Sequence, residues 1–213
     1  MGLRSYLSVA HISRTKRMGT LSGLVKAIAV VQGLDENQVL WIARYLREAG
    51  LITQGGRGRG GARMTVSDAA NLLIGVNAPG APKDSAALVQ AFRDLDLTFD
   101  ALSDPDPDEW DASSEEVFRR GSPFGPALEH VIADFIKSGT YPVSEELTRV
   151  TLSGPLLNAS IFCGAPDAER AGDVSISVQF STDEMPGKNF PDQYVSKSFT
   201  DRTLSAVGQI LAT

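Results

Sequence analysis

The sequence predicts an α+β fold in two parts, a basic part that is mainly helical and an acidic part of helices followed by strands. Three observations lead to this prediction. Apolar residues recur every three or four positions in most segments between residues 20 and 138, which is typical of helices. From residue 147 onward they alternate with polar residues, which is typical of strands. A Pro/Gly-rich connector, residues 79–85, lies between two such regions and predicts domains at 1–78 and 85–213.

The composition is that of a globular chain without a membrane span. Hydrophobic residues make up 42% and charged residues 22% of the 213 residues, both ordinary values. No run approaches the roughly 18 apolar residues that cross a bilayer, and the N-terminus does not resemble a secretion signal. The single cysteine, Cys163, excludes an internal disulfide. We therefore expect a cytoplasmic protein that does not contact membranes.

Two helices open the basic part. The first is predicted over residues 20–33, with Thr20 as its cap and Gly33 as its stop. Asp35 is the cap candidate of the second, which continues to a stop at Gly50. The second helix has one apolar stripe, formed by Val39, Ile42, Ala43 and Leu46.

After the second helix the sequence predicts a strand, a glycine-rich loop and another strand. The strands are expected at residues 51–53 and 63–66, and GGRGRGGA (55–62) between them is too rich in glycine for regular structure. Ser67 is the cap candidate of a further helix that runs to residue 78.

The order helix, tight turn, helix, strand, Gly/Arg loop, strand over residues 19–66 resembles winged helix-turn-helix transcription regulators. Leu46–Ile52 matches the L-x-x-x-G-L-I join between recognition helix and wing in that family. Such proteins usually have a further helix in front, and residues 3–18 either form it or act as a flexible basic arm that enters a DNA groove.

The resemblance implies a set of residues that contact double-stranded DNA. The second helix would lie in the major groove. Asn and Gln side chains pair with adenine and Arg with guanine. The candidates on this helix are Asn37, Gln38, Trp41, Arg44 and Tyr45. Arg57, Arg59 and Arg63 would clamp the DNA backbone or the minor groove, and Arg14, Lys16 and Arg17 would add phosphate contacts.

The distribution of charge agrees with this assignment. Residues 1–66 contain ten Lys/Arg and three Asp/Glu, a net charge of +7. The rest of the chain contains 10 basic and 23 acidic residues, a net charge of −13, so the whole chain has −6. Such asymmetry is typical of proteins in which one part binds nucleic acid.

The acidic part is predicted to begin with two amphipathic helices, residues 86–97 and 124–138. An acidic, proline-containing loop, residues 103–116, separates them. Four strands follow, with Gly154-Pro155 as a hairpin turn, and a helix over residues 201–211 capped by Thr200 closes the chain. The strands are expected at residues 147–152, 157–163, 174–180 and 194–199.

No motif of a catalytic, metal or cofactor site is found. The two histidines, His11 and His130, and Cys163 are too few and too scattered for a zinc site. The loop GGRGRGG lacks the Gly-Lys-Ser/Thr of a phosphate-binding loop. We therefore expect a protein that is not an enzyme and uses no cofactor and no metal.

The expected function is sequence-specific binding of double-stranded DNA as a transcriptional regulator of bacterial or phage type. Residues 85–213 would form a homodimer, bind a ligand or contact the transcription machinery, and dimerisation is preferred because one module reads few bases. The main alternative is an adaptor for phage-type DNA packaging or replication initiation. A winged helix that binds only proteins, or RNA binding by the GGRGRGG tract, is a further alternative.

Overall fold

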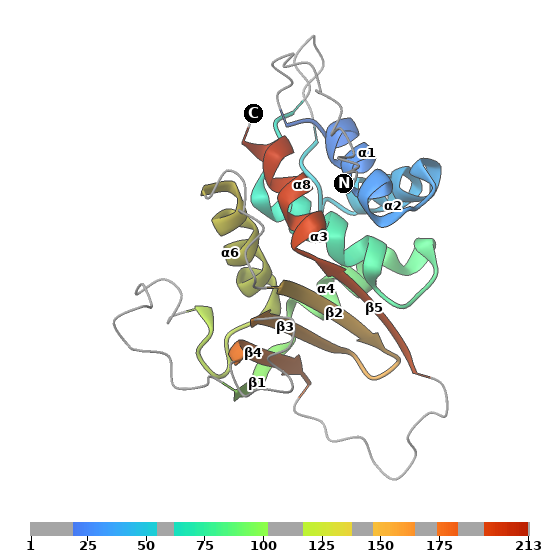
Figure 1. Ribbon diagram of the computed structural model, residues 1–213. Coiled ribbons are helices and arrows are strands. Elements are labelled where there is room, and N and C mark those ends of the chain that lie inside the picture. Colours follow the sequence, from blue (N-terminus) through green and yellow to red (C-terminus); the bar gives the residue numbers. More distant parts are fainter. Residues whose placement is uncertain are drawn as a thin grey trace, which may run out of the picture.

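The computed structural model of the chain describes residues 19–54, 62–101, 117–137, 147–164, 174–182 and 194–212. Helices come first, and a five-stranded antiparallel sheet with a C-terminal helix follows, so the predicted α+β class is confirmed (Figure 1). The elements are α1 (Leu21–Gln32), α2 (Glu36–Glu48), α3 (Val66–Asn77), the 3-10 helix η1 (Pro82–Asp84), α4 (Ser85–Arg93), β1 (Asp96–Ala101), α6 (Phe124–Lys137), β2 (Leu147–Gly154), β3 (Asn158–Gly164), β4 (Val174–Ser181), β5 (Val195–Thr200) and α8 (Asp201–Leu211).

Helices α1 and α2 begin and end where the sequence predicts, because local capping chemistry sets their ends. The Thr20 hydroxyl accepts the N–H of Gly23 at 3.2 Å, and Gly33 ends α1 in the left-handed conformation with φ 66°. The Asp35 carboxylate accepts the N–H groups of Asn37 and Gln38 at the start of α2. After α2, Gly50 has φ 76°.

The prediction of two strands beside the Gly/Arg loop is wrong. Residues 51–54 and 62–65 form no strand. Their backbone N–H groups bond elsewhere: Thr53 and Thr65 both donate to the carboxylate of Asp68, and Met64 donates to the carbonyl of Gly19 at 2.8 Å. No ladder between the two segments therefore forms in the part of the loop that is described.

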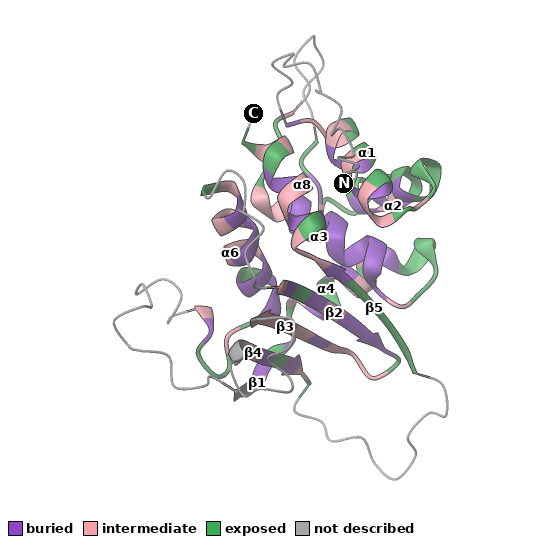
Figure 2. Ribbon diagram, in the orientation of Figure 1, coloured by how far each residue is buried: buried purple, intermediate pink, exposed green. Residues whose placement is uncertain are grey.

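Helix α3 is the central helix of the core. Its cap is Thr65 rather than the predicted Ser67, because Thr65 and Asp68 form a reciprocal capping box. Every residue from Asp68 to Asn77 is buried, so the helix is covered on all sides rather than on one face (Figure 2). Gly75 lets α2 approach closely, since a Cβ there would lie 3.0 Å from the Leu46 Cδ1 atom.

The sheet has the strand order β1-β4-β3-β2-β5, and all neighbours are antiparallel. The four strands predicted from alternation are confirmed as β2 to β5, and residues 155–157 form the turn between β2 and β3. The fifth strand, β1, corrects the predicted helix over residues 86–97, which ends at Arg93 as α4.

Helices cover one face of the sheet (Figure 1). The side chains on that face are fully buried or nearly so, and they are Val150, Leu152, Ala159, Ile161, Val178, Phe180 and Phe199. Phe124 of α6 meets Phe180 of β4 edge-on, with ring centroids 5.2 Å apart. The opposite face is mainly polar and includes Arg149, Thr151, Ser160 and Gln179. No described helix is long and apolar enough to span a membrane.

The predicted connector, residues 79–85, contains η1 and the first residue of α4. Elements on either side of it pack together, α1 against α8 and α3 against α6, and the buried apolar residues form one cluster. Domains at 1–78 and 85–213 stay a prediction. The predicted basic arm, the loop 55–61 and the acidic loop 103–116 lie outside the described residues.

Candidate nucleic-acid interface

Helices α1 and α2, predicted as a helix-turn-helix pair, are joined by a turn of three residues, 33–35. The apolar stripe of α2 is buried, with Val39, Ala43 and Leu46 at 0% exposure and Ile42 at 3%. Helix α2 packs against both α1 and α3. The opposite face of α2 is thereby presented to solvent (Figure 2).

The predicted major-groove residues lie on this solvent face. Asn37, Gln38, Trp41 and Arg44 are exposed, and Tyr45 is half-buried. The Arg44 guanidinium lies 5.5 Å from the centre of the Trp41 ring and donates to the Glu48 carboxylate at 2.8 Å. The hydrogen bond to Glu48 raises the pKa of Arg44. Two neighbours, Trp41 and Glu48, therefore restrict the position of the Arg44 side chain.

The exposed face of α2 has no net charge. Glu36 and Glu48 balance Arg44 and Arg47, and all four residues are exposed. Of the ten basic residues in the first 66, only Lys26, Arg44, Arg47 and Arg63 lie in the described part of the chain. The other six belong to residues 1–18 and to the loop 55–61. Helix α2 therefore contributes no net positive charge, and most of the basic residues of this part lie outside the described residues.

The carboxylate of Asp68 ties the two ends of the Gly/Arg loop together. One oxygen accepts the N–H of Thr53 at 2.7 Å, and the other accepts the N–H of Thr65 at 2.7 Å and its hydroxyl at 2.9 Å. Asp68 is only 4% exposed. Ile52 and Met64, next to these two threonines, are buried at 1% and 9% exposure. The base of the loop is thus fixed although no strands form it.

Further hydrogen bonds join this base to α2 and to the acidic part. The Gln54 amide donates to the carbonyl of Arg47 at 3.1 Å, at the C-terminal end of α2. The Asn71 amide donates to the carbonyl of Leu51 at 2.6 Å. Arg93 then donates to the Asn71 side chain at 2.8 Å and to the Glu129 carboxylate of α6 at 2.6 Å. A polar chain therefore runs from the loop base through α3 and α4 to α6.

Of the remaining predicted DNA contacts, one lies in the described part of the chain and five do not. Arg63 is exposed beside the loop base. Arg57 and Arg59, with Arg14, Lys16 and Arg17, lie outside the described residues and stay predictions. Sequence reasoning missed Asp68 and Asn71 as positioning residues. The pattern Thr-x-x-Asp at 65–68 is a capping-box signal that identifies Asp68, whereas nothing local indicates the Asn71–Arg93 contact.

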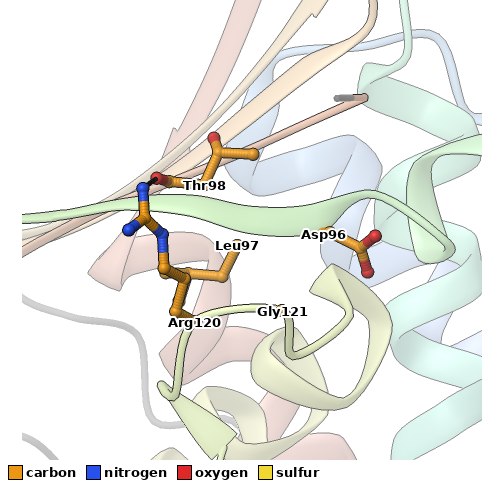
Figure 3. Close-up of a pocket in the computed structure, with 5 residues that line it drawn as sticks. All are labelled: Asp96, Leu97, Thr98, Arg120 and Gly121. Atoms are coloured by element: carbon orange, nitrogen blue, oxygen red, sulfur yellow. Dashed lines mark hydrogen bonds between the residues drawn. The ribbon is translucent and has the colours of Figure 1, made fainter. Parts of the chain in front are cut away.

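A hollow of about 270 Å³ lies at the start of β1 (Figure 3). Its lining is Asp96, Leu97, Thr98, Arg120 and Gly121. The Arg120 guanidinium donates to the backbone carbonyl of Thr98 at 3.2 Å, and Asp96 points away from it (Figure 3). This arrangement holds the chain at 119–121 against β1. The described residues contain no group of three or more His, Cys, Asp or Glu side chains placed to hold a metal ion.

Comparisons of the chain with known protein families, with curated proteins and with solved structures found no match.

Proposed function

We propose that this protein is a sequence-specific regulator of transcription that binds double-stranded DNA through α2 and the Gly/Arg loop. The observation that carries the proposal is the Asp68 carboxylate, which fixes both ends of a loop containing Arg57 and Arg59 at the C-terminal end of α2. A loop of glycines and arginines has no role in packing a core, whereas arginines in a loop with fixed ends suit phosphate and groove contacts.

The two contact surfaces have different tasks in this proposal. The loop and Arg63, together with Arg14, Lys16 and Arg17, supply charge, which gives affinity for any duplex and little choice among sequences. The neutral face of α2 supplies Asn37, Gln38 and Arg44, which read base edges, and Trp41 and Tyr45, which contact thymine methyl groups or sugars. Each correct base contact contributes about 1–3 kcal/mol of discrimination.

The acidic part completes the proposal. Residues 67–213 have a net charge of −13, which repels phosphate, so residues 85–213 face away from DNA and form the homodimer, with transcription machinery as a further partner. A dimer doubles the bases that are read and matches a pseudo-palindromic site. The protein acts in the cytoplasm, without a cofactor and without a catalytic step.

Mapping of bound DNA across the genome of the source organism tests this function. Discrete peaks at promoters, with a two-fold repeated sequence and altered transcript levels on deletion, are the expected result. A single peak at a packaging or replication origin, with unchanged transcripts, supports the adaptor instead. Uniform occupancy, or none, contradicts sequence-specific DNA binding.

A further inference from the structure

The two outer strands of the sheet, β1 and β5, differ in how their outer edges are covered. The chain just before α6 runs along the outer edge of β1. The N–H of Leu97 donates to the carbonyl of Ser122 at 2.9 Å, and the carbonyl of Leu97 accepts the N–H of Gly121 at 3.0 Å. The register of β1 with β4 also shifts between Leu97 and Phe99. An edge that is already bonded and irregular does not accept a further strand.

The outer edge of β5 has neither form of protection in the described part of the chain. The register of β5 with β2 is unbroken from Val195 to Thr200, and this segment contains no proline, aspartate or glutamate. No described backbone group outside β2 bonds to β5, which is exposed along most of its length (Figure 2). Its one charged residue, Lys197, donates to the carbonyl of Ala78 at 3.3 Å and is thereby directed toward the end of α3. Alternate N–H and C=O groups of β5 therefore remain available to another strand.

The two ends of β5 complement each other. Tyr194 and Val195, 55% and 50% exposed, are apolar side chains at its start. A shallow hollow, open to solvent, lies beside residues 197–200 and includes the half-buried side chains of Val31 and Leu34. When a strand pairs antiparallel with its own copy, the start of each strand lies beside the end of the other. The exposed apolar side chains of each copy then lie beside the hollow of the other.

We propose that β5 pairs with β5 of a second copy of this chain, so that the two five-stranded sheets form one antiparallel sheet. The backbone groups of the two edges supply the hydrogen bonds, and Tyr194 and Val195 supply apolar contact. This dimer names the surface of the homodimer in the proposed function, but its formation follows from the free edge and does not depend on DNA binding.

The symmetry of this pairing sets the arrangement of the helices. Residues opposite each other in an antiparallel pair point to the same face of a sheet, so the two-fold axis is perpendicular to the joined sheet. The helical layers of both copies consequently lie on the same face. Two copies of the α1–α2 pair on one side of the dimer suit a two-fold repeated DNA site, and this consequence alone rests on the proposed function.

Sedimentation equilibrium of the full chain without DNA tests the dimer. We expect the mass of two chains, with a dissociation constant on the order of 10 µM. Val195→Lys places a charge at the contact in both copies and should raise this constant at least about tenfold. Leu40→Lys is the matched control, because Leu40 of α2 is 52% exposed and lies away from the sheet edge, and it should dimerise as the wild type. Thermal unfolding checks that both variants fold.

Cysteine cross-linking tests the same pairing without a charge in the contact. A disulfide needs Cα atoms about 4.4–6.8 Å apart, and a residue meets its own copy at that distance only beside the two-fold axis. Among Ser196→Cys, Lys197→Cys and Ser198→Cys, one variant should therefore form a disulfide-linked dimer much faster than the others. Asp96→Cys at the covered edge of β1, and the wild type with its half-buried Cys163, are the controls and should not cross-link.

A single-chain mass at all concentrations overturns the proposal and leaves the β5 edge to an extended segment of another protein. A dimer that tolerates Val195→Lys and cross-links at none of the three positions also overturns it, because the copies then meet elsewhere. These measurements contain no DNA, so a chain that dimerises but binds no duplex contradicts only the proposed function. A monomer that binds duplex DNA contradicts only the dimer.

Discussion

Replacement of Asp68 by alanine removes the carboxylate that ties the base of the Gly/Arg loop. Three hydrogen bonds are lost, two from backbone N–H groups of Thr53 and Thr65 at 2.7 Å and one from the Thr65 hydroxyl. A hydrogen bond to a charged group contributes about 1.5–3 kcal/mol. If only the two backbone bonds are counted, each at about 1.5 kcal/mol, the free energy of unfolding falls by about 3 kcal/mol. For a chain of this size, that lowers Tm by about 6–12 °C.

Urea denaturation followed by circular dichroism measures this loss. The Thr65 hydroxyl still accepts the N–H of residue 68 in the variant, so the start of α3 keeps its cap and the loss reports the carboxylate. Asp94→Ala removes an exposed aspartate after α4 and should change stability by less than about 0.5 kcal/mol. A loss below about 1 kcal/mol for Asp68→Ala would show that the loop base does not depend on this residue.

Three further predictions concern packing and the polar chain. Gly19→Ala places a Cβ 2.8 Å from the backbone oxygen of Ile210, so we expect a loss of about 1–3 kcal/mol in urea denaturation, and a neutral result would mean that α8 moves freely. Phe180→Ala should cost about 3–5 kcal/mol, whereas Phe162→Ala on the other face of the sheet should cost clearly less; equal losses would contradict the assignment of the two faces. Arg93→Met should cost about 1–3 kcal/mol because it leaves the Asn71 oxygen without its donor, and a double-mutant cycle with Glu129→Gln should give a non-zero coupling energy; strict additivity would refute the ion pair.

The ends of the first two helices could be predicted because each depends on residues within a few positions. Thr20, Gly33 and Asp35 act through backbone groups of their own turn. Ser67 was a reasonable cap by type, but Thr65 takes that place because its side chain and that of Asp68 bond reciprocally. The local sequence pattern therefore predicted the helix but placed its start two residues too late.

The errors around residues 51–66 and 86–97 have non-local causes. The short apolar runs beside the Gly/Arg loop indicate strands, yet the Thr53 and Thr65 N–H groups bond to a buried carboxylate that competes with a ladder. Leu95 continues the helical spacing of α4, but residues from Asp96 pair with β4, where Asp96 lies opposite Ser181. A local sequence pattern cannot indicate pairing with β4, because that strand follows much later in the chain.

The exposed face of α2 could be predicted from the sequence, whereas its charge balance could not. The buried stripe of α2 correctly located its exposed face, and Asn37, Gln38, Trp41 and Arg44 lie there. The balance of Glu36 and Glu48 against Arg44 and Arg47 was not foreseen, because the charge was summed over all 66 residues. The central claim consequently rests on the loop arginines more than on α2.

The most direct test of that claim is the salt dependence of binding to duplex DNA, measured by fluorescence anisotropy between 50 and 200 mM salt. The variant Arg57→Ala/Arg59→Ala is compared with Arg119→Ala/Arg149→Ala, which removes the same charge from exposed positions of the acidic part. We predict that the loop variant lowers the slope of log affinity against log salt by about 2, one for each phosphate contact, and that the control leaves it unchanged. An equal slope for wild type and loop variant, or a wild-type chain that does not bind duplex DNA, would contradict the account.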